Sequence, residues 1–139
     1  MIVVDTNVVS ELMRVTPAGA VVGWIRARRA GELFTTAITV AEIRYGIERL
    51  PSGRRQDLLR TTADGAFAAF DDQVLPFDGA AALHYASVVT RRDEAGLPID
   101  EFDAQIAAIC HANGARLATR HRRDFVGTGI DVVDPWERD

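Results

Sequence analysis

Lysine is absent from this 139-residue sequence, so all 16 basic side chains apart from histidine belong to arginine. A Walker A loop, a Schiff-base enzyme and a hydrolase that transfers phosphate with a catalytic lysine each need an ammonium group at a defined place. A receiver domain needs one too. The sequence therefore argues against all four classes.

Cysteine is almost absent as well, because Cys110 is the only one. The chain can form no internal disulfide and no cysteine-rich zinc cluster. Cys110 falls in an apolar helical pattern, where we expect a small buried side chain and not a nucleophile. The histidines at positions 84, 111 and 121 are not spaced as a zinc-binding pair.

Long hydrophobic runs are missing too, since no window approaches the roughly 18 consecutive apolar residues that a membrane helix needs. The N-terminus has no basic region ahead of its apolar run and carries an acid at position 5. We therefore expect a cytoplasmic protein with no membrane partner. The net charge of −4 argues against a general nucleic-acid coat, although it leaves room for a local basic groove.

Short β-branched runs alternate with segments of helical periodicity, and no linker or repeat interrupts them. Strands separated by helices pair in parallel through right-handed crossovers. The pattern predicts one α/β domain over residues 1–139, with three layers in which helices flank a central parallel sheet of about five strands. The expected strands are 2–4, 33–38, 74–77, 116–119 and 131–133. The expected helices start near residue 8, cover 20–29, 39–50, 54–70 and 79–95, and end with one that Asp100 caps and whose apolar face is Phe102, Ile106 and Ile109.

Four acidic residues fall where such a sheet can gather them. Asp5 closes the first strand, Glu42 lies in the first turn of the helix after the second strand, and Asp124 follows the fourth. Loops after the carboxyl ends of parallel strands converge on one edge, so these three are expected to meet there. Asp103 follows a helix and a loop instead, and its arrival at the same edge does not follow from the pattern. It heads an apolar helical stripe, where a carboxylate is costly unless a cation compensates it.

Carboxylates within a few ångströms of each other raise one another's pKa values unless a divalent cation holds them ionised. Oxygen ligands suit Mg²⁺ or Mn²⁺, which also bind waters and phosphate oxygens. A metal ion so placed can lower the pKa of a bound water and neutralise the charge that grows on a phosphodiester. The acids thus predict hydrolysis of a nucleic-acid backbone with Mg²⁺, for which Mn²⁺ can substitute.

Four segments and the chain end carry a family likeness. They are residues 2–12 (IVVDTNVVSEL), 39–46 (TVAEIRYG), 102–108 (FDAQIAA) and 117–125 (LATRHRRDF), with Pro135 and Trp136 near the end. In order and in spacing they resemble the PIN-domain ribonuclease toxins of the VapC family, most closely the FitB-like branch. The likeness spans nearly the whole chain.

This resemblance implies a Mg²⁺-dependent endoribonuclease that is the toxin of a type II toxin–antitoxin pair. Its catalytic and metal-binding acids would be Asp5, Glu42, Asp103 and Asp124, with Asp5 and Asp103 as the direct ligands. The residues that would line the pocket or contact the substrate are Thr6, Asn7, Asp100, Thr119, Arg120 and Arg123. Arg120 and Arg123, with Arg122, flank Asp124 and would bind RNA phosphates. His121 departs from the family, which usually has asparagine after the Thr-Arg pair, and this bears on substrate contacts.

The resemblance also implies partners. They are RNA as the substrate, a second copy of the chain in a homodimer, and a small DNA-binding antitoxin whose C-terminal tail covers the active site. Operator DNA would be bound only through the toxin–antitoxin complex.

Each acid also has a purely structural interpretation. Asp5 suits a helix cap, Glu42 makes a Thr-x-x-Glu capping box with Thr39, Asp103 suits a first helical turn and Asp124 a plain turn. Four such coincidences in motif order favour the metal site. Two other functions stay open: a catalytically silent PIN-like module that helps its partner repress DNA, and a phosphoaspartyl enzyme with Asp5 as nucleophile, which the absence of lysine disfavours.

Overall fold

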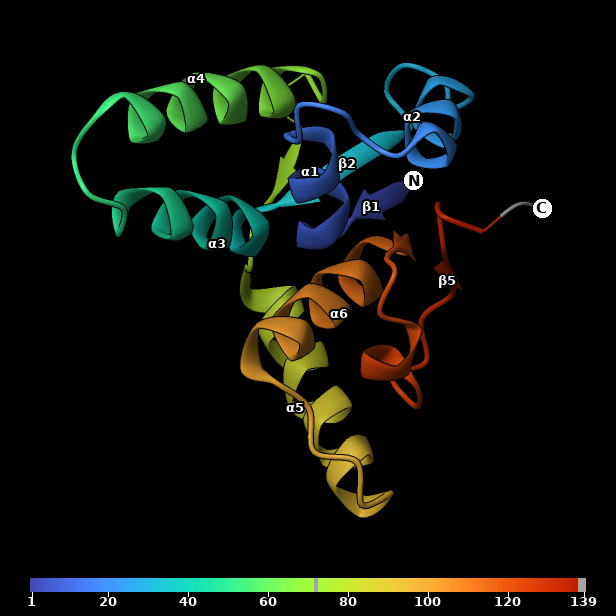
Figure 1. The fold of residues 1–139 in the computed structure, drawn as a ribbon. Coiled ribbons are helices and arrows are strands. Elements are labelled where there is room, and N and C mark those ends of the chain that lie inside the picture. The colour runs from blue at the N-terminus through green and yellow to red at the C-terminus, as the bar shows by residue number, and fades with distance from the viewer. Residues whose placement is uncertain (72, 138–139) are drawn as a thin grey trace.

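Short parallel strands joined by helices form one sheet in the computed structural model, which describes residues 1–71 and 73–137 (Figure 1). The strand order is β3-β2-β1-β4-β5, so the first strand lies at the centre. In the register of the sheet, Val3 lies beside Phe34 on one side and Leu117 on the other. The strands are β1 (Ile2–Val4), β2 (Leu33–Thr36), β3 (Val74–Leu75), β4 (Arg116–Ala118) and β5 (Val132–Val133).

Helices cover both faces of this sheet, which confirms the predicted three layers (Figure 1). One face packs against α1 (Thr6–Leu12), α2 (Gly19–Arg26), α3 (Ala37–Glu48) and α4 (Arg54–Ala68). The other face packs against α5 (Gly79–Glu94) and α6 (Glu101–Asn113). A single 3-10 turn, η1 (Arg122–Phe125), follows β4.

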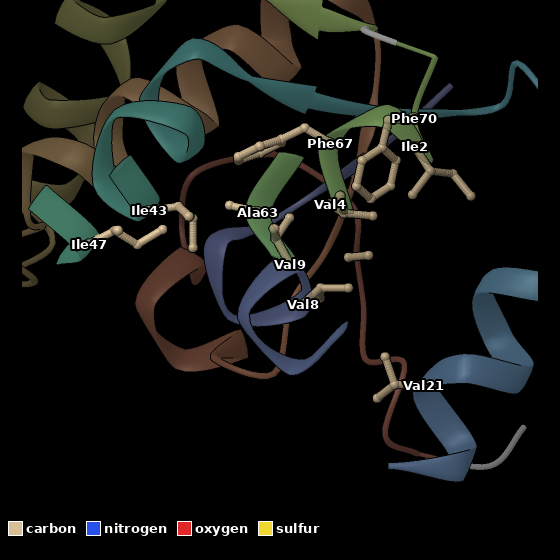
Figure 2. Packing of buried hydrophobic residues seen from close by; sticks show 11 residues of the cluster. Ile2, Val4, Val8, Val9, Val21, Ile43, Ile47, Ala63, Phe67 and Phe70 are labelled. Carbon is tan, nitrogen blue, oxygen red and sulfur yellow. The ribbon is translucent and has the colours of Figure 1, made fainter. Parts of the chain in front are cut away.

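Alternate side chains of β1 divide the core in two. Val4 packs with Val8, Ile43 and Phe67 on the side of α1, α3 and α4 (Figure 2), whereas Val3 packs on the side of α5 and α6. Val3, Val4 and Val8 are fully buried, and each such side chain stabilises the fold by about 1.5–3 kcal/mol relative to an exposed one. This packing fixes the starts of α1 and α3 against the end of β1.

The second strand ends earlier than predicted, and a helix begins where its last two residues were expected. Thr36 caps α3, because its Oγ1 accepts a hydrogen bond from the backbone N–H of Thr39 at 3.1 Å. Ala37 and Ile38 are therefore helical. The β-branched side chain of Ile38 favours a strand locally, but its contacts lie with the core on the side of α5 and α6.

Phe102 does not belong to the apolar face predicted for α6. It is 49% exposed, whereas Ile106 and Ile109 are fully buried. Phe102 has the helical spacing of Ile106 and Ile109, but it lies in the first turn of α6. Other elements cover the helix only beyond this turn, so Phe102 stays exposed. The buried Cys110 is as predicted, and burial raises the pKa of its thiol.

In the part of the chain that the structure describes, the helices are too short or too polar to cross a lipid bilayer.

Candidate active site

Asp5 joins the end of β1 to the start of α1 and is 4% exposed. Its Oδ1 accepts a hydrogen bond from the backbone N–H of Thr6 at 2.8 Å and so caps the helix. Its Oδ2 accepts one from the hydroxyl of Thr119 at 2.8 Å and one from the amide of Asn7 at 3.1 Å. Burial raises the pKa of Asp5, and these hydrogen bonds oppose that rise.

Asn7 ties the start of α1 to the loop after β4. Its Nδ2 also donates to Oγ1 of Thr119 at 2.9 Å, and its Oδ1 accepts from the backbone N–H of Arg120 at 3.0 Å. Thr119 is fully buried, and its Oγ1 accepts a further hydrogen bond from the backbone N–H of His121 at 3.1 Å. The loops after two neighbouring strands are thereby held together by side chains that also hold Asp5.

Glu42 lies in the second turn of α3 and not in the first, because the helix begins at Ala37. The predicted capping box is therefore wrong: Thr36 is the N-cap, and Thr39 is already inside the helix. Glu42 is bound instead across the sheet edge, where the hydroxyl of Thr6 donates to its Oε1 at 3.0 Å.

Threonine hydroxyls form a small network behind this carboxylate. Oγ1 of Thr39 lies 3.2 Å from Oγ1 of Thr6 and 3.3 Å from Oγ1 of Thr36. Partial burial raises the pKa of Glu42, and the charge of Asp5 adds to the rise. The arrangement links Glu42 to the residue that follows Asp5 in the chain.

Asp103 lies at the same edge of the sheet as Asp5 and Glu42. The sequence pattern did not predict this placement. The helix α6 precedes β4 and runs in the opposite direction to it, so its N-terminus lies near the carboxyl ends of the strands. Asp100 caps α6, and its Oδ2 accepts from the backbone N–H groups of Phe102 and Asp103 at 3.0 and 3.4 Å. Asp103 follows in the first turn, half-buried.

Neighbouring carboxylates perturb Asp103 strongly. Burial and the negative charges of Asp5, Asp100, Asp124 and Glu42 together raise its pKa from 3.8 to about 7. The four predicted acids and Asp100 are therefore near enough to act on one another.

Asp124 lies in η1 and is exposed, as are the basic residues around it. Nδ1 of His121 is 3.7 Å from one of its carboxylate oxygens. The guanidinium of Arg122 pairs with Glu137 at 2.9 Å, and that of Arg120 lies over the ring of Trp136, 5.0 Å from its centroid. Residues 120–124 line a hollow of about 490 Å³ together with Asp134 and Glu137.

The donor set consists of carboxylate, hydroxyl and amide oxygens, which are the ligands that Mg²⁺ and Mn²⁺ prefer. Within residues 1–71 and 73–137, no three histidine, cysteine, aspartate or glutamate side chains converge into a preformed metal-binding group. The neighbouring carboxylates therefore act on one another without closing on one point. This arrangement fits Mg²⁺, because that ion keeps several waters and takes only one or two carboxylates directly.

An open groove of about 830 Å³ leads away from the site between α1, α3 and α4. Thr6 and Glu42 lie at its site end, and its lining includes the apolar side chains of Met13, Ile47 and Leu59. Arg14 and Arg55 also contribute to it. The groove therefore combines an apolar surface with cationic groups, directly beside the carboxylates.

Sequence reasoning missed three parts of this region. The hydroxyl network of Thr36 and Thr39 was not expected, although a threonine at a strand end, as at position 36, is a recognisable N-cap signal. The groove was not predicted, because it depends on how α4 packs against α3. The third part is Arg92 in the last turn of α5, which is buried and donates hydrogen bonds to the carbonyl groups of Pro98 and Val126. In the sequence it has the pattern of an ordinary surface arginine.

Comparisons with known proteins give a consistent family. The PIN domain family matches residues 2–128. The VapC ribonuclease Y4jK of Sinorhizobium fredii is 40% identical over 138 residues, which cover 99% of both chains. Toxin FitB of Neisseria gonorrhoeae is 33% identical over 137 residues, which cover 98% of this chain and 99% of the relative. The solved structure of FitAB bound to an IR36 DNA fragment matches with a TM-score of 0.91 and 32% identity, over 100% of this chain and 98% of that one.

Proposed function

The chain belongs to the PIN-domain family, in the branch that holds the VapC and FitB toxins, and from this premise we propose that it is a Mg²⁺-dependent endoribonuclease. In this proposal it is the toxin of a type II toxin–antitoxin pair and acts in the cytoplasm, where cellular RNA is. The observation that carries the proposal is the environment of Asp103, where burial and then the charges of four neighbouring carboxylates raise the pKa of this half-buried acid to about 7. An unpaired cluster of this kind is costly without a cation.

Asp5 and Asp103 are the residues that we assign to direct metal binding, with Mn²⁺ as a substitute ion. When bound, the ion would hold the carboxylates ionised, lower the pKa of a water molecule and offset the charge that develops on the phosphodiester. Asp124 and Asp100 add negative charge at the rim of the same space.

The chain itself holds the carboxylates of Asp5 and Glu42 rigidly in place. Thr119, Asn7 and the N-terminus of α1 hold Asp5 in one orientation, so little reorganisation is needed when substrate arrives. Thr6 donates to Oε1 of Glu42, and we assign the other oxygen, Oε2, to accept a hydrogen bond from the attacking water.

Arginines beside Asp124 are assigned to the RNA backbone. Arg120 and Arg123 are exposed next to the acids, and guanidinium groups bind phosphate oxygens well. Arg122 is expected to contribute less, because its guanidinium is already paired with Glu137. His121 is exposed between these groups, with Nδ1 3.7 Å from a carboxylate oxygen of Asp124, and we assign it to a contact with the nucleotide.

A small DNA-binding antitoxin is the proposed partner, and its C-terminal segment is assigned to the groove between α1, α3 and α4. The groove opens onto Thr6 and Glu42, so a segment lying in it would block the site. FitAB, a structural relative, was solved bound to DNA. We propose that this chain likewise meets operator DNA only within such a complex, and that it forms a homodimer.

The test is cleavage of a total RNA pool by purified, antitoxin-free protein in Mg²⁺, in Mn²⁺ and in EDTA. We expect discrete fragments with either ion and none in EDTA. Asp103→Asn is the informative variant, because Asp103 is half-buried and its removal leaves the Asp5 cap intact. It is expected to lower the cleavage rate at least about a hundredfold.

Glu101→Gln is the matched control, since Glu101 lies in the same helical turn and is exposed. It should cleave like the wild type. Absence of cleavage by folded wild-type protein would instead favour the catalytically silent module, and gel-shift assays of the toxin–antitoxin complex on its operator would then examine that function. A covalent phosphate on Asp5 would point to the phosphoaspartyl alternative.

A further inference from the structure

Arg92 is a buried arginine that holds two loops of the protein together. It lies in the last turn of α5 and is 5% exposed. Its guanidinium group donates three hydrogen bonds to backbone carbonyl oxygens: Nε to Leu97 at 2.7 Å, Nη1 to Val126 at 2.6 Å and Nη2 to Pro98 at 3.3 Å. The acceptors come from segments that are far apart in the sequence.

The first of these segments leads into α6. Leu97 is held at both of its backbone groups by Arg92, because its own N–H donates to the Arg92 carbonyl at 2.8 Å. Two residues beyond Pro98 stands Asp100, the cap of α6, whose carboxylate binds the backbone N–H of Asp103. Arg92 thus fixes the chain just before the turn that carries Asp103.

The second segment leads away from η1. Val126 is the residue at which the turn ends, two positions after Asp124, and its N–H donates to the carbonyl of Arg123 at 3.4 Å. Phe125 is buried, so the turn is also anchored in the core. The same guanidinium that holds the entry to α6 therefore holds the exit from the turn with Asp124.

We infer that Arg92 is a positioning residue, which sets the place of Asp103 relative to that of Asp124 by joining their two loops through one guanidinium. This inference rests on the proposed function for its consequence in metal binding. Only arginine offers a rigid planar fork with five donors, and here three of them reach three acceptors. Lysine keeps the charge without the fork, whereas methionine removes the donor from all three carbonyl groups.

The experiment compares Arg92→Lys and Arg92→Met with the wild type, and uses Arg91→Lys as the control. Arg91 is the exposed neighbour on the same helix. Two quantities are measured on the full chain: amide hydrogen exchange by mass spectrometry and the Kd for Mn²⁺ by electron paramagnetic resonance. The kcat and KM for RNA cleavage are measured in parallel.

For Arg92→Lys we expect amide exchange at least about tenfold faster in both residues 97–103 and residues 122–128, with β1 and β4 unchanged. The Kd for Mn²⁺ should rise about tenfold, as is typical when support for a metal ligand is lost. The kcat should fall by a larger factor than KM rises, because Asp103 and Asp124 both lie in the loosened segments, whereas only Arg123 of the two arginines assigned to RNA does. Arg91→Lys should match the wild type in every measurement.

The inference is overturned if Arg92→Lys exchanges and binds Mn²⁺ like the wild type, or if only one of the two segments exchanges faster. Should Arg92→Met fail to fold, Arg92→Lys decides. Should the wild type neither bind Mn²⁺ nor cleave RNA, the proposed function fails, and the exchange of the two segments still answers whether Arg92 joins them.

Discussion

The carboxylate of Asp103 stands among like charges, and this makes it the most informative single residue of the protein. Its pKa of about 7 means that, without a cation, the side chain is only partly ionised near neutral pH. Replacement by asparagine removes the charge and keeps the shape. The same substitution that is expected to end the proposed metal-dependent cleavage should therefore relieve repulsion in the metal-free protein.

We predict that Asp103→Asn raises the free energy of unfolding by about 1–2 kcal/mol at pH 8 in EDTA, and by much less at pH 5. A rise in pKa from 3.8 to about 7 corresponds to about 4 kcal/mol, and solvent around this half-exposed side chain reduces that figure. Urea denaturation at the two pH values measures the difference. An equal gain at both pH values, or a gain in Glu101→Gln, would contradict an electrostatic origin.

Thr6 supports Glu42 with a single hydroxyl, which Thr6→Val removes with little change of shape. A hydrogen bond to a charged acceptor contributes about 1.5–3 kcal/mol, so we predict a fall in kcat of about tenfold or more with an unchanged fold. The rate of RNA cleavage and the circular dichroism spectrum measure the two effects. Thr61→Val is the control, because the Thr61 hydroxyl donates only to the carbonyl of Asp57 in its own helix.

The end of α5 matters because it begins the segment that leads to the site. Gly96 follows the helix with φ = +70°, and its N–H bonds to the carbonyl of Asp93 while that of Leu97 bonds to Arg92. These two hydrogen bonds form a Schellman motif, which favours glycine at this position. The helix end is thus specified by backbone conformation as much as by side chains.

Two glycine substitutions are predicted to change stability in opposite directions. Gly96→Ala should lower the free energy of unfolding by about 1 kcal/mol, because alanine is strained at positive φ. Gly65→Ala, inside α4, should raise it by about 0.5–1 kcal/mol, because there the new methyl group has open space. Thermal or urea unfolding of both variants measures this, and a shift of the same sign in both would refute it.

Local residue patterns were sufficient to predict the parallel sheet and the acids that follow its strands. The parallel sheet followed from β-branched runs between helices, and the gathering of Asp5, Glu42 and Asp124 followed from the strand ends. Element ends were less accurate: a threonine cap at Thr36 ended a strand that Ile38 would have continued. Local propensity does not show which carbonyl groups a long side chain will reach, so the role of Arg92 could not be predicted from residue patterns.

The acidic cluster makes the stability of the folded protein depend on pH. In the folded protein the pKa values of Asp5, Glu42 and Asp103 are all raised above those of ordinary carboxyl groups. The folded state therefore holds protons that the unfolded state has already lost. Stability is then greatest when these groups are protonated in both states, and it falls as the pH rises through the folded-state pKa values.

We predict that the metal-free protein loses stability steadily between about pH 4 and pH 7, the window between the ordinary pKa of Asp103 and its pKa in the folded protein. Addition of Mg²⁺ at pH 8 should restore the melting temperature, whereas at pH 5 it should have little effect. Differential scanning calorimetry in EDTA and in Mg²⁺ measures both. A melting temperature in EDTA that rises steadily from pH 5 to pH 8 would be incompatible with this account.

Asp5 serves two purposes at once, since one carboxylate oxygen caps α1 and the other faces the threonine and asparagine that order the site. Loss of this residue would weaken the folded chain as well as its proposed activity. Asp124 is exposed at the rim of the candidate active site, and we assign it no such second, structural role. A lineage in which catalysis is no longer selected is therefore expected to lose the acids at the rim first and to keep Asp5 for longer. The presence of Asp5 in a relative is thus evidence for the fold and not, by itself, for catalysis.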